Sequence, residues 1–278
     1  MKYLRFTDHD IDALPGAPEA VPDEGWLWID GDYDEVRDWV PEVRRLFGVE
    51  IFENHLSDAQ NRLHPSFFGS TRDYEMIVFR GLASANDEPE DGRLIRIRTR
   101  PTVFFVLPRC LVTVRAPDSA TVPALQSRLL DAQASRQRVP LAPEELMLRI
   151  LNAMVDRYLE LRQPLTDLLE RWQRLLLDPS RPFRDWYALL EARGELRKLE
   201  QLCEEQLDAL QEWRDERVDG ARSGHRLSGG FTAIADPLLV RTADVVEHIQ
   251  RVLNHARRLE ASVESAVQLH FSSTAHRT

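Results

Sequence analysis

Three side chains that can bind a metal ion lie close together near the C-terminal end of the chain. Asp244, Glu247 and His248 are spaced i, i+3 and i+4 within a helical pattern, so they share one helix face. Carboxylate oxygens suit Mg²⁺, whereas an imidazole beside carboxylates suits Zn²⁺ or another transition metal. The residue types leave the choice of metal open. They also fit a solvated helix face, in which Arg241 and Arg251 offset the acids.

The other reactive residue types give no enzyme signature. The sequence contains no GxSxG, P-loop, GxGxxG or HExxH pattern. Cys110 and Cys203 stand apart without CxxC spacing, which predicts two buried thiols. Residues 8–10, Asp-His-Asp, are interpreted as a polar N-terminal segment rather than an acid–base group. His255 follows His248 by seven residues and extends the candidate metal stripe by two turns. We expect no catalytic residues.

The composition favours cations over nucleic acids as partners. The 278 residues carry a formal net charge of −10, whereas nucleic-acid binding relies on clustered positive charge. A hydrophobic content of 43% lets the chain bury a sizeable core. The best candidate for a membrane span, residues 101–108, is far shorter than the required run of about 20 apolar residues. The N-terminus lacks the apolar run of a signal peptide, so we expect a cytoplasmic location.

The first half of the chain, residues 1–140, alternates short strands with helices. Apolar runs and polar–apolar alternation predict strands, and apolar residues at helical spacing predict helices. The predicted strands are residues 26–29, 74–79, 94–98, 102–107 and 111–115, and the predicted helices are residues 33–47, ending at Gly48, and 122–138. A turn-rich connector is expected at residues 86–92. We therefore expect an α/β domain in which helices cover a mixed sheet (α/β/α).

The second half, residues 141–278, shows the 3.5-residue apolar repeat of coiled-coil helices and no strand signal. Breaks at residues 179–182 and 219–230 divide it into three long helices. Pro164 predicts a kink near Leu161, and Gln206 interrupts the apolar repeat of the second helix. The third helix, from about Asp236, would run about 60 Å. It lacks a C-cap, so we expect the natural chain to continue.

Several local patterns, taken in their order, resemble one known family. They are residues 25–30, 46–54, 111–115, 145–158 and 270–278. The best single match lies within residues 145–158, where Asn152, Ala153, Asp156 and Tyr158 fit a hydrophobic, Asp/Asn, Ala, hydrophobic, hydrophobic, Asp, x, Tyr pattern. Together these patterns resemble the cytoplasmic portion of the CorA/ZntB family of divalent metal-ion transporters. The family's Gly-Met-Asn loop would lie downstream of residue 278.

The resemblance implies a cytoplasmic sensing and gating domain of a magnesium channel or transporter. It implies a homopentameric funnel whose third long helix lines the axis, joined to the inner or plasma membrane through helices absent from this chain. Intersubunit ions would favour the closed state. Zinc or proton-coupled transport, as in ZntB-like members, is one alternative, with Zn²⁺ or Co²⁺ in place of Mg²⁺. A soluble helical scaffold that binds a protein partner is the other.

The resemblance also suggests site residues. Asp244 aligns with an acidic position that in magnesium-type members helps to hold a regulatory ion between subunits. Its partner from the α/β domain stays open among Asp58, Asp73 and Asp87. Small polar residues would let five helices approach the axis, and the pore-lining candidates are Ser262, Ser265, Ser272, Ser273 and Thr274. The same residues also fit a moderately polar helix face.

Overall fold

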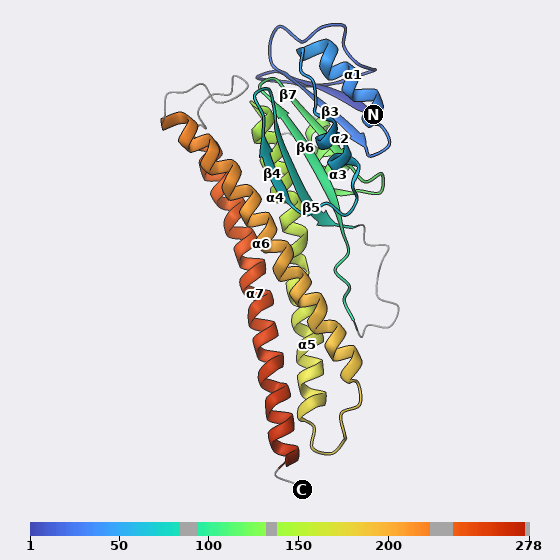
Figure 1. The fold of residues 1–278 in the computed structure, drawn as a ribbon, viewed down its shortest axis with the longest axis vertical. Coiled ribbons are helices and arrows are strands. Elements are labelled where there is room, and N and C mark those ends of the chain that lie inside the picture. Colours follow the sequence, from blue (N-terminus) through green and yellow to red (C-terminus); the bar gives the residue numbers. More distant parts are fainter. Residues whose placement is uncertain (84–93, 132–137, 223–235, 276–278) are drawn as a thin grey trace.

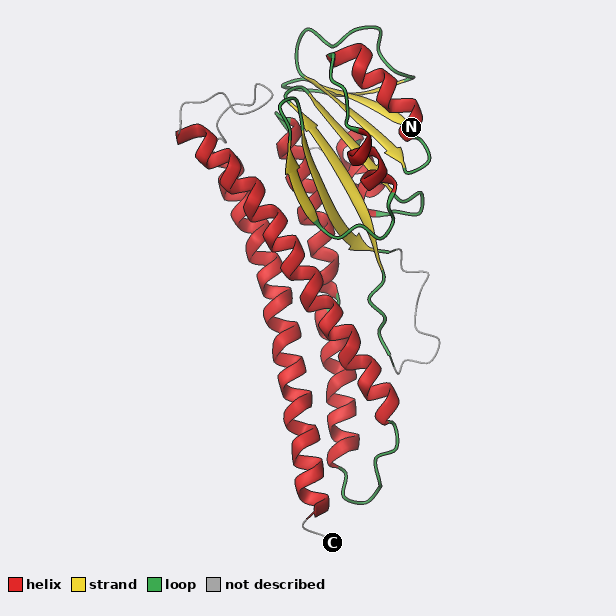
Figure 2. Ribbon diagram, in the orientation of Figure 1, coloured by secondary structure: helices red, strands yellow, loops and turns green. Residues whose placement is uncertain are grey.

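The computed structural model describes residues 1–83, 94–131, 138–222 and 236–275, without the side chains of residues 220–222 and 274. A strand-rich domain at one end carries long helices that extend well beyond it (Figure 1). Helices lie on both faces of the sheet, and the long helices run side by side toward the C-terminal end of the chain (Figure 2). The predicted α/β/α arrangement followed by long helices is confirmed.

The sheet has seven strands and is mixed. They are β1 (Lys2–Phe6), β2 (Ile11–Leu14), β3 (Trp26–Asp32), β4 (Phe67–Ser70), β5 (Glu75–Leu82), β6 (Thr99–Leu107) and β7 (Cys110–Arg115). Their order across the sheet is β2-β1-β3-β7-β6-β5-β4. The pair of β3 and β7 is parallel, and the other neighbouring pairs are antiparallel.

Helices cover the two faces of the sheet because its strands are apolar on both sides. One face packs against α1 (Val36–Phe47) and α2 (Glu53–Gln60), the other against α3 (Thr121–Leu130) and α4 (Pro143–Glu160). Along β3, Leu27 and Ile29 join the cluster of α1, whereas Trp26 and Trp28 join that of α4. Fully burying a side chain of this kind stabilises the fold by about 1.5–3 kcal/mol. As predicted, α1 ends at Gly48, which adopts a φ of 67° that other residues rarely take.

The long helices are α4, α5 (Arg162–Leu177), α6 (Trp186–Arg222) and α7 (Asp236–Ala275). Helix α4 ends at Glu160 and α5 begins at Arg162, so the helix is interrupted at Leu161, the position at which a kink was predicted. Pro164 lies in the first turn of α5, where its missing N–H is tolerated. Most predicted repeat positions are buried, although Leu175 is 40% exposed. The proposed boundary near residue 140 stays a prediction, since α4 packs against both the sheet and α7.

The strand predicted at residues 94–98 is wrong. The chain joins the sheet at Thr99, where β6 begins, and the preceding residues are not paired with a strand. The buried backbone N–H of Ile97 instead donates to Glu195 Oε2 of α6, at 2.6 Å. In residues 94–98, the alternation of Ile and Arg therefore reflects packing against α6 rather than pairing with a strand. The connector predicted at residues 86–92 lies outside the described residues.

Other boundaries also differ from the sequence prediction. Strands β1, β2 and β4 were not predicted, because charged residues interrupt their short apolar patterns or because their runs are very short. The helix predicted at residues 122–138 ends at Leu130, since Asp131 has an extended backbone with ψ of 99°. The Asp-His-Asp segment, residues 8–10, lies in the turn between β1 and β2, where hydrogen bonds join Thr7 and Asp10.

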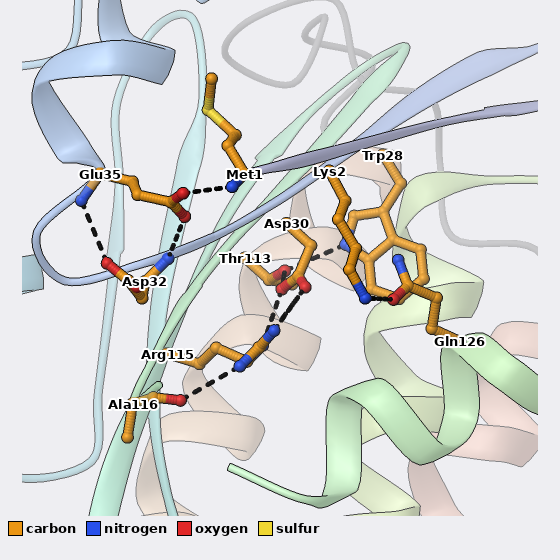
Figure 3. A network of polar contacts seen from close by, with 10 residues as sticks. All are labelled: Met1, Lys2, Trp28, Asp30, Asp32, Glu35, Thr113, Arg115, Ala116 and Gln126. Atoms are coloured by element: carbon orange, nitrogen blue, oxygen red, sulfur yellow. Dashed lines mark hydrogen bonds and ion pairs between the residues drawn. The ribbon is translucent and has the colours of Figure 1, made fainter. Parts of the chain in front are cut away.

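A buried ion pair joins the parallel strands β3 and β7 (Figure 3). The Asp30 carboxylate accepts from Arg115 Nη2 at 2.9 Å, from Arg115 Nε at 3.0 Å and from the Thr113 hydroxyl at 2.7 Å. Trp28 Nε1 donates to the same hydroxyl at 3.0 Å. The residue Asp30 is 1% exposed. This network fixes the register of the two strands, because a buried carboxylate is tolerated only when its lone pairs are satisfied.

A second buried cluster attaches α6 to the sheet. Arg217 contacts Glu75 of β5 at 2.6 Å and Glu144 of α4 at 3.1 Å, and Trp213 Nε1 donates to Glu75 at 2.9 Å. Burial raises the pKa of Glu75, although Arg217 and Trp213 oppose the shift. Gln206, the polar interruption of the repeat, donates to the carbonyl of Arg80 at 2.7 Å. It is therefore an anchor between helix and sheet.

Candidate metal-binding face of the last long helix

Helix α7 buries one face and exposes the other. Its buried positions pack against α4, α5 and α6; they are Thr242, Val245, Ile249, Val252, Leu253, Ala256, Val263 and Ala266. An exposed row runs along the opposite side at seven-residue spacing: Asp244, Arg251, Arg258, Ser265 and Ser272. The apolar repeat produces this division, because positions outside the seam face away from the packed helices. The acid and the serines lie at the two ends of the row.

The imidazole of His248 lies between two carboxylates. Its Nε2 is 3.6 Å from Asp244 Oδ1, and its Nδ1 is 3.3 Å from Asp156 Oδ1 of α4. The side chain of Asp244 is 55% exposed, and that of Asp156 is 49% exposed. Nδ1 makes no hydrogen bond within the described part of the chain, so the Asp156 carboxylate lies beside it without bonding to it. The two carboxylates approach different ring nitrogens and do not converge on one point.

Asp156 was not predicted as a neighbour of the candidate site. It belongs to the family-like pattern at residues 151–158, but nothing in that pattern relates it to a residue about ninety positions away. Asn152 Nδ2 lies 3.3 Å from Asp156 Oδ2 and helps to hold the carboxylate. Asp156 therefore connects α4 to the acidic end of the α7 row.

Glu247 and His255 depart from the predicted stripe. Glu247 forms an exposed ion pair with Arg251, as the solvated-face alternative expects. His255 turns toward α5, where its Nε2 lies 3.1 Å from the carbonyl of Arg162 and 3.2 Å from the Thr166 hydroxyl. Burial lowers the pKa of His255, the hydrogen bond with the Arg162 carbonyl opposes this shift, and the charges of Arg162 and Arg258 act in the same direction as burial. In this chain His255 is a packing residue, and Asp244 and His248 are the pair that lies together.

The candidate pore residues divide into two groups. Ser265 and Ser272 are exposed on the same row as Asp244, and Ser273 is exposed beside them. Ser262 instead accepts a hydrogen bond from Gln173 of α5, at 2.6 Å. The side chain of Thr274 lies outside the described residues. Their role in a pore stays a prediction, because one chain does not define an axis.

The three acids proposed as partners of Asp244 lie elsewhere or are not described. Asp58 is 3.6 Å from the imidazole of His64, Asp73 is exposed beside Tyr74, and Asp87 lies outside the described residues. Among the residues that the structure describes, no group of three or more His, Cys, Asp or Glu side chains is arranged to hold a metal ion. The metal site of Asp244, Glu247 and His248 therefore stays a prediction that concerns an assembly of chains.

Comparison with known proteins identifies the class. The model of the family described as "CorA-like Mg2+ transporter protein" matches residues 23–278, which is most of the chain. The chain belongs to the CorA family of divalent-cation transporters. Members of this family are membrane-bound transporters rather than enzymes. Within the described residues, no helix combines the length and apolar character that a membrane span requires. A search of curated proteins finds no match.

Solved structures agree on the fold. The CorA magnesium transporter from Methanocaldococcus jannaschii has a TM-score of 0.69 at 14% identity, over 100% of this chain and 78% of that one. The ZntB cytoplasmic domain from Vibrio parahaemolyticus has a TM-score of 0.66 at 13% identity, over 100% and 97%. The soluble domain of the M. jannaschii CorA has a TM-score of 0.66 at 14% identity, over 97% and 96%. At these identities the likeness establishes the fold.

Proposed function

We propose that this chain is the cytoplasmic sensing and gating domain of a homopentameric magnesium channel or transporter. In this proposal, divalent ions held between subunits at the Asp244 end of α7 favour the closed state. The observation that carries it is the half-exposed Asp244 carboxylate, whose one described ionic partner is an imidazole 3.6 Å away. An exposed carboxylate costs little to leave unpaired, so an external ion can become its partner. The remaining ligands would come from a neighbouring subunit or from water.

Net charge gives the closure its driving force. A chain with a net charge of −10 repels its own copies, and five of them carry about −50 together. Divalent ions between acidic faces relieve this repulsion, and their loss would loosen the assembly. The exposed serines lie at the other end of the row, where hydroxyls can bond the water shell that Mg²⁺ keeps. Arg251 and Arg258 separate the two ends, so the sensing and pore-lining roles belong to different parts of α7.

Zinc transport is the second candidate, and His248 is the observation that favours it. An imidazole between Asp244 and Asp156 offers nitrogen and oxygen donors that suit Zn²⁺. The likeness to a ZntB domain is compatible with this candidate, although it concerns the fold. The scaffold hypothesis receives no support, since the chain belongs to a transporter family.

Calorimetry on the purified chain tests the proposal and separates the metals. We expect weak binding of Mg²⁺ and Co²⁺ that Asp244→Asn reduces. Asp208→Asn, which removes an exposed acid of α6, is the matched control and should bind as the parent does. A strong preference for Zn²⁺ that disappears in His248→Ala would mean that the chain serves a zinc transporter rather than a magnesium transporter. Absence of binding for all three metals would contradict an ion-sensing role of this chain.

A further inference from the structure

A pocket of about 390 Å³ lies where α3, α4 and α7 meet. Four arginines line it, together with an amide and one carboxylate; these residues are Arg128, Arg138, Arg149, Arg241, Asn152 and Asp156. We call this group the arginine pocket. Four guanidinium groups around one cavity are unexpected in a chain with a net charge of −10. Their convergence needs a physical reason.

Internal acids neutralise part of this charge. Glu145 of α4 contacts Arg149 Nη2 at 2.7 Å and Arg241 Nη2 at 3.4 Å. Asp156, which also lies 3.3 Å from His248, adds a second negative charge. Arg128 and Arg138 have no ion-pair partner among the described residues, and both are exposed. The pocket and Glu145 together hold four positive and two negative groups, so a net positive charge remains.

Two polar atoms of the pocket residues are buried and unpartnered. Arg149 Nε and Asn152 Oδ1 have no hydrogen-bond partner within the described part of the chain. Buried polar groups are usually satisfied, so both atoms indicate a missing partner. Arg149 Nε needs an acceptor, and Asn152 Oδ1 needs a donor. A divalent cation can coordinate an amide oxygen but gives Arg149 Nε no acceptor, and the arginines would repel it.

We propose that the arginine pocket binds a phosphate group of a soluble small molecule. A phosphate has several anionic oxygens that accept from guanidinium groups, and its hydrogen phosphate form also carries an O–H. Arginine is suited to this task because its planar donor fork matches two phosphate oxygens. The pocket lies near Arg241, about 50 Å along α7 from the described C-terminal end, at a rise of about 1.5 Å per residue. In the proposed function, on which this choice of ligand rests, the membrane lies beyond the C-terminal end of α7, so a soluble ligand fits the pocket better than a lipid headgroup does.

Calorimetry with inorganic phosphate and pyrophosphate, against sodium chloride of matched ionic strength, tests the proposal. We expect saturable binding by the parent protein. Arg128→Gln combined with Arg138→Gln should raise the dissociation constant by about ten-fold or more. Arg258→Gln removes an exposed arginine farther along α7 and should leave binding unchanged. Circular dichroism confirms that each variant is folded, as expected for exposed positions.

Arg149→Lys separates directed hydrogen bonding from general charge. It keeps the positive charge but removes Nε and the planar fork, so we expect weaker binding of both probes. No saturable binding of either probe by the parent would overturn the proposal, as would equal binding by the parent and the double variant. An equal loss in Arg258→Gln would also overturn it, since general charge would then explain the affinity.

Vesicles test the source of the phosphate. The protein is sedimented with vesicles of phosphatidylglycerol and phosphatidylcholine, and we expect no binding that depends on Arg128 and Arg138. Vesicle binding lost in the double variant, without binding of the soluble probes, would contradict a soluble ligand and assign the pocket to lipid headgroups.

Discussion

Charged side chains behave differently in the sheet and on the outer face of α7. Asp30 is 1% exposed, and Arg115 and Thr113 satisfy its carboxylate inside the chain. The side chain of Asp244 is 55% exposed, and an imidazole 3.6 Å away is its one described ionic partner. A buried charge must be neutralised by the fold, so it determines structure. An exposed charge adds little stability and stays available to an ion.

Removing a buried charge should have the largest effect on stability. Asp30→Asn leaves the Arg115 guanidinium buried without its counter-charge, which should lower the free energy of unfolding by about 3–5 kcal/mol. Urea denaturation followed by circular dichroism measures this change. Asp34→Asn, an exposed site in the same domain, is the control and should change it by less than about 0.5 kcal/mol. Similar values for the two variants would remove the contrast between buried and exposed charge.

Disrupting the Arg217 cluster that attaches α6 to the sheet should lower the free energy of unfolding by an amount that depends on pH. Arg217→Met leaves Glu75 and Glu144 buried without their shared cation, and we expect a loss of about 3 kcal/mol near pH 8. Burial already raises the pKa of Glu75 above its ordinary value of 4.5. A carboxyl with a raised folded-state pKa gives stability that is present at low pH and lost as the pH rises through that pKa. The variant should therefore regain stability toward pH 5, and a pH-independent loss would contradict this explanation.

His255 is partly buried, between the buried Asp30 and the half-exposed Asp244. Its protonation should change the free energy of unfolding less than the two substitutions above. Burial against α5 lowers its pKa below the ordinary value of 6.5, so the folded state resists protonation. Stability should fall as the pH drops from about 6.5 through the folded-state pKa, by a few tenths of a kcal/mol after solvent screening. NMR titration of the imidazole measures the pKa directly. Denaturation of His255→Gln should lack this part of the pH dependence, and a pKa above 6.5 would contradict the packing role.

Local patterns predicted the long helices because their repeat depends on nearby residues. Leu151, Leu196 and Val252 fall on the apolar seam and are buried. The pattern at residues 94–98 misled for the same reason, since alternation does not tell whether a strand or a helix supplies the partner. Glu195, which accepts the hydrogen bond from the backbone N–H of Ile97, lies about a hundred residues from Ile97 in the sequence. Sequence spacing cannot supply such a contact.

The candidate site was predictable only along one helix. Asp244 and His248 are four residues apart, so helix geometry relates them. Asp156 and the arginine pocket combine residues of α3, α4 and α7, which only the fold brings together. The turn of His255 toward α5 also depends on tertiary packing, since its spacing from His248 suggested a shared stripe. The intersubunit partner that the proposed function requires for Asp244 would depend on a further level, the assembly of chains.

Changing the exposed acid should have the smallest effect on folding and a large effect on the response to ions. Asp244→Asn should change the free energy of unfolding by less than about 0.5 kcal/mol, because the carboxylate is half exposed. If it holds an ion between subunits, the same substitution removes a ligand from the assembled state. A typical coupling between sites corresponds to a shift of roughly 5- to 150-fold in ion dependence.

Sedimentation velocity at increasing Mg²⁺ and constant ionic strength tests the central claim most directly. The parent chain should shift from monomer toward pentamer as Mg²⁺ rises, with Asp208→Asn behaving as the parent does. Asp244→Asn should need roughly 5- to 150-fold more Mg²⁺ for the same shift. A parent chain that stays monomeric at every Mg²⁺ concentration, or an Asp244→Asn variant that assembles at the parent's concentration, would contradict an ion held by Asp244 between subunits.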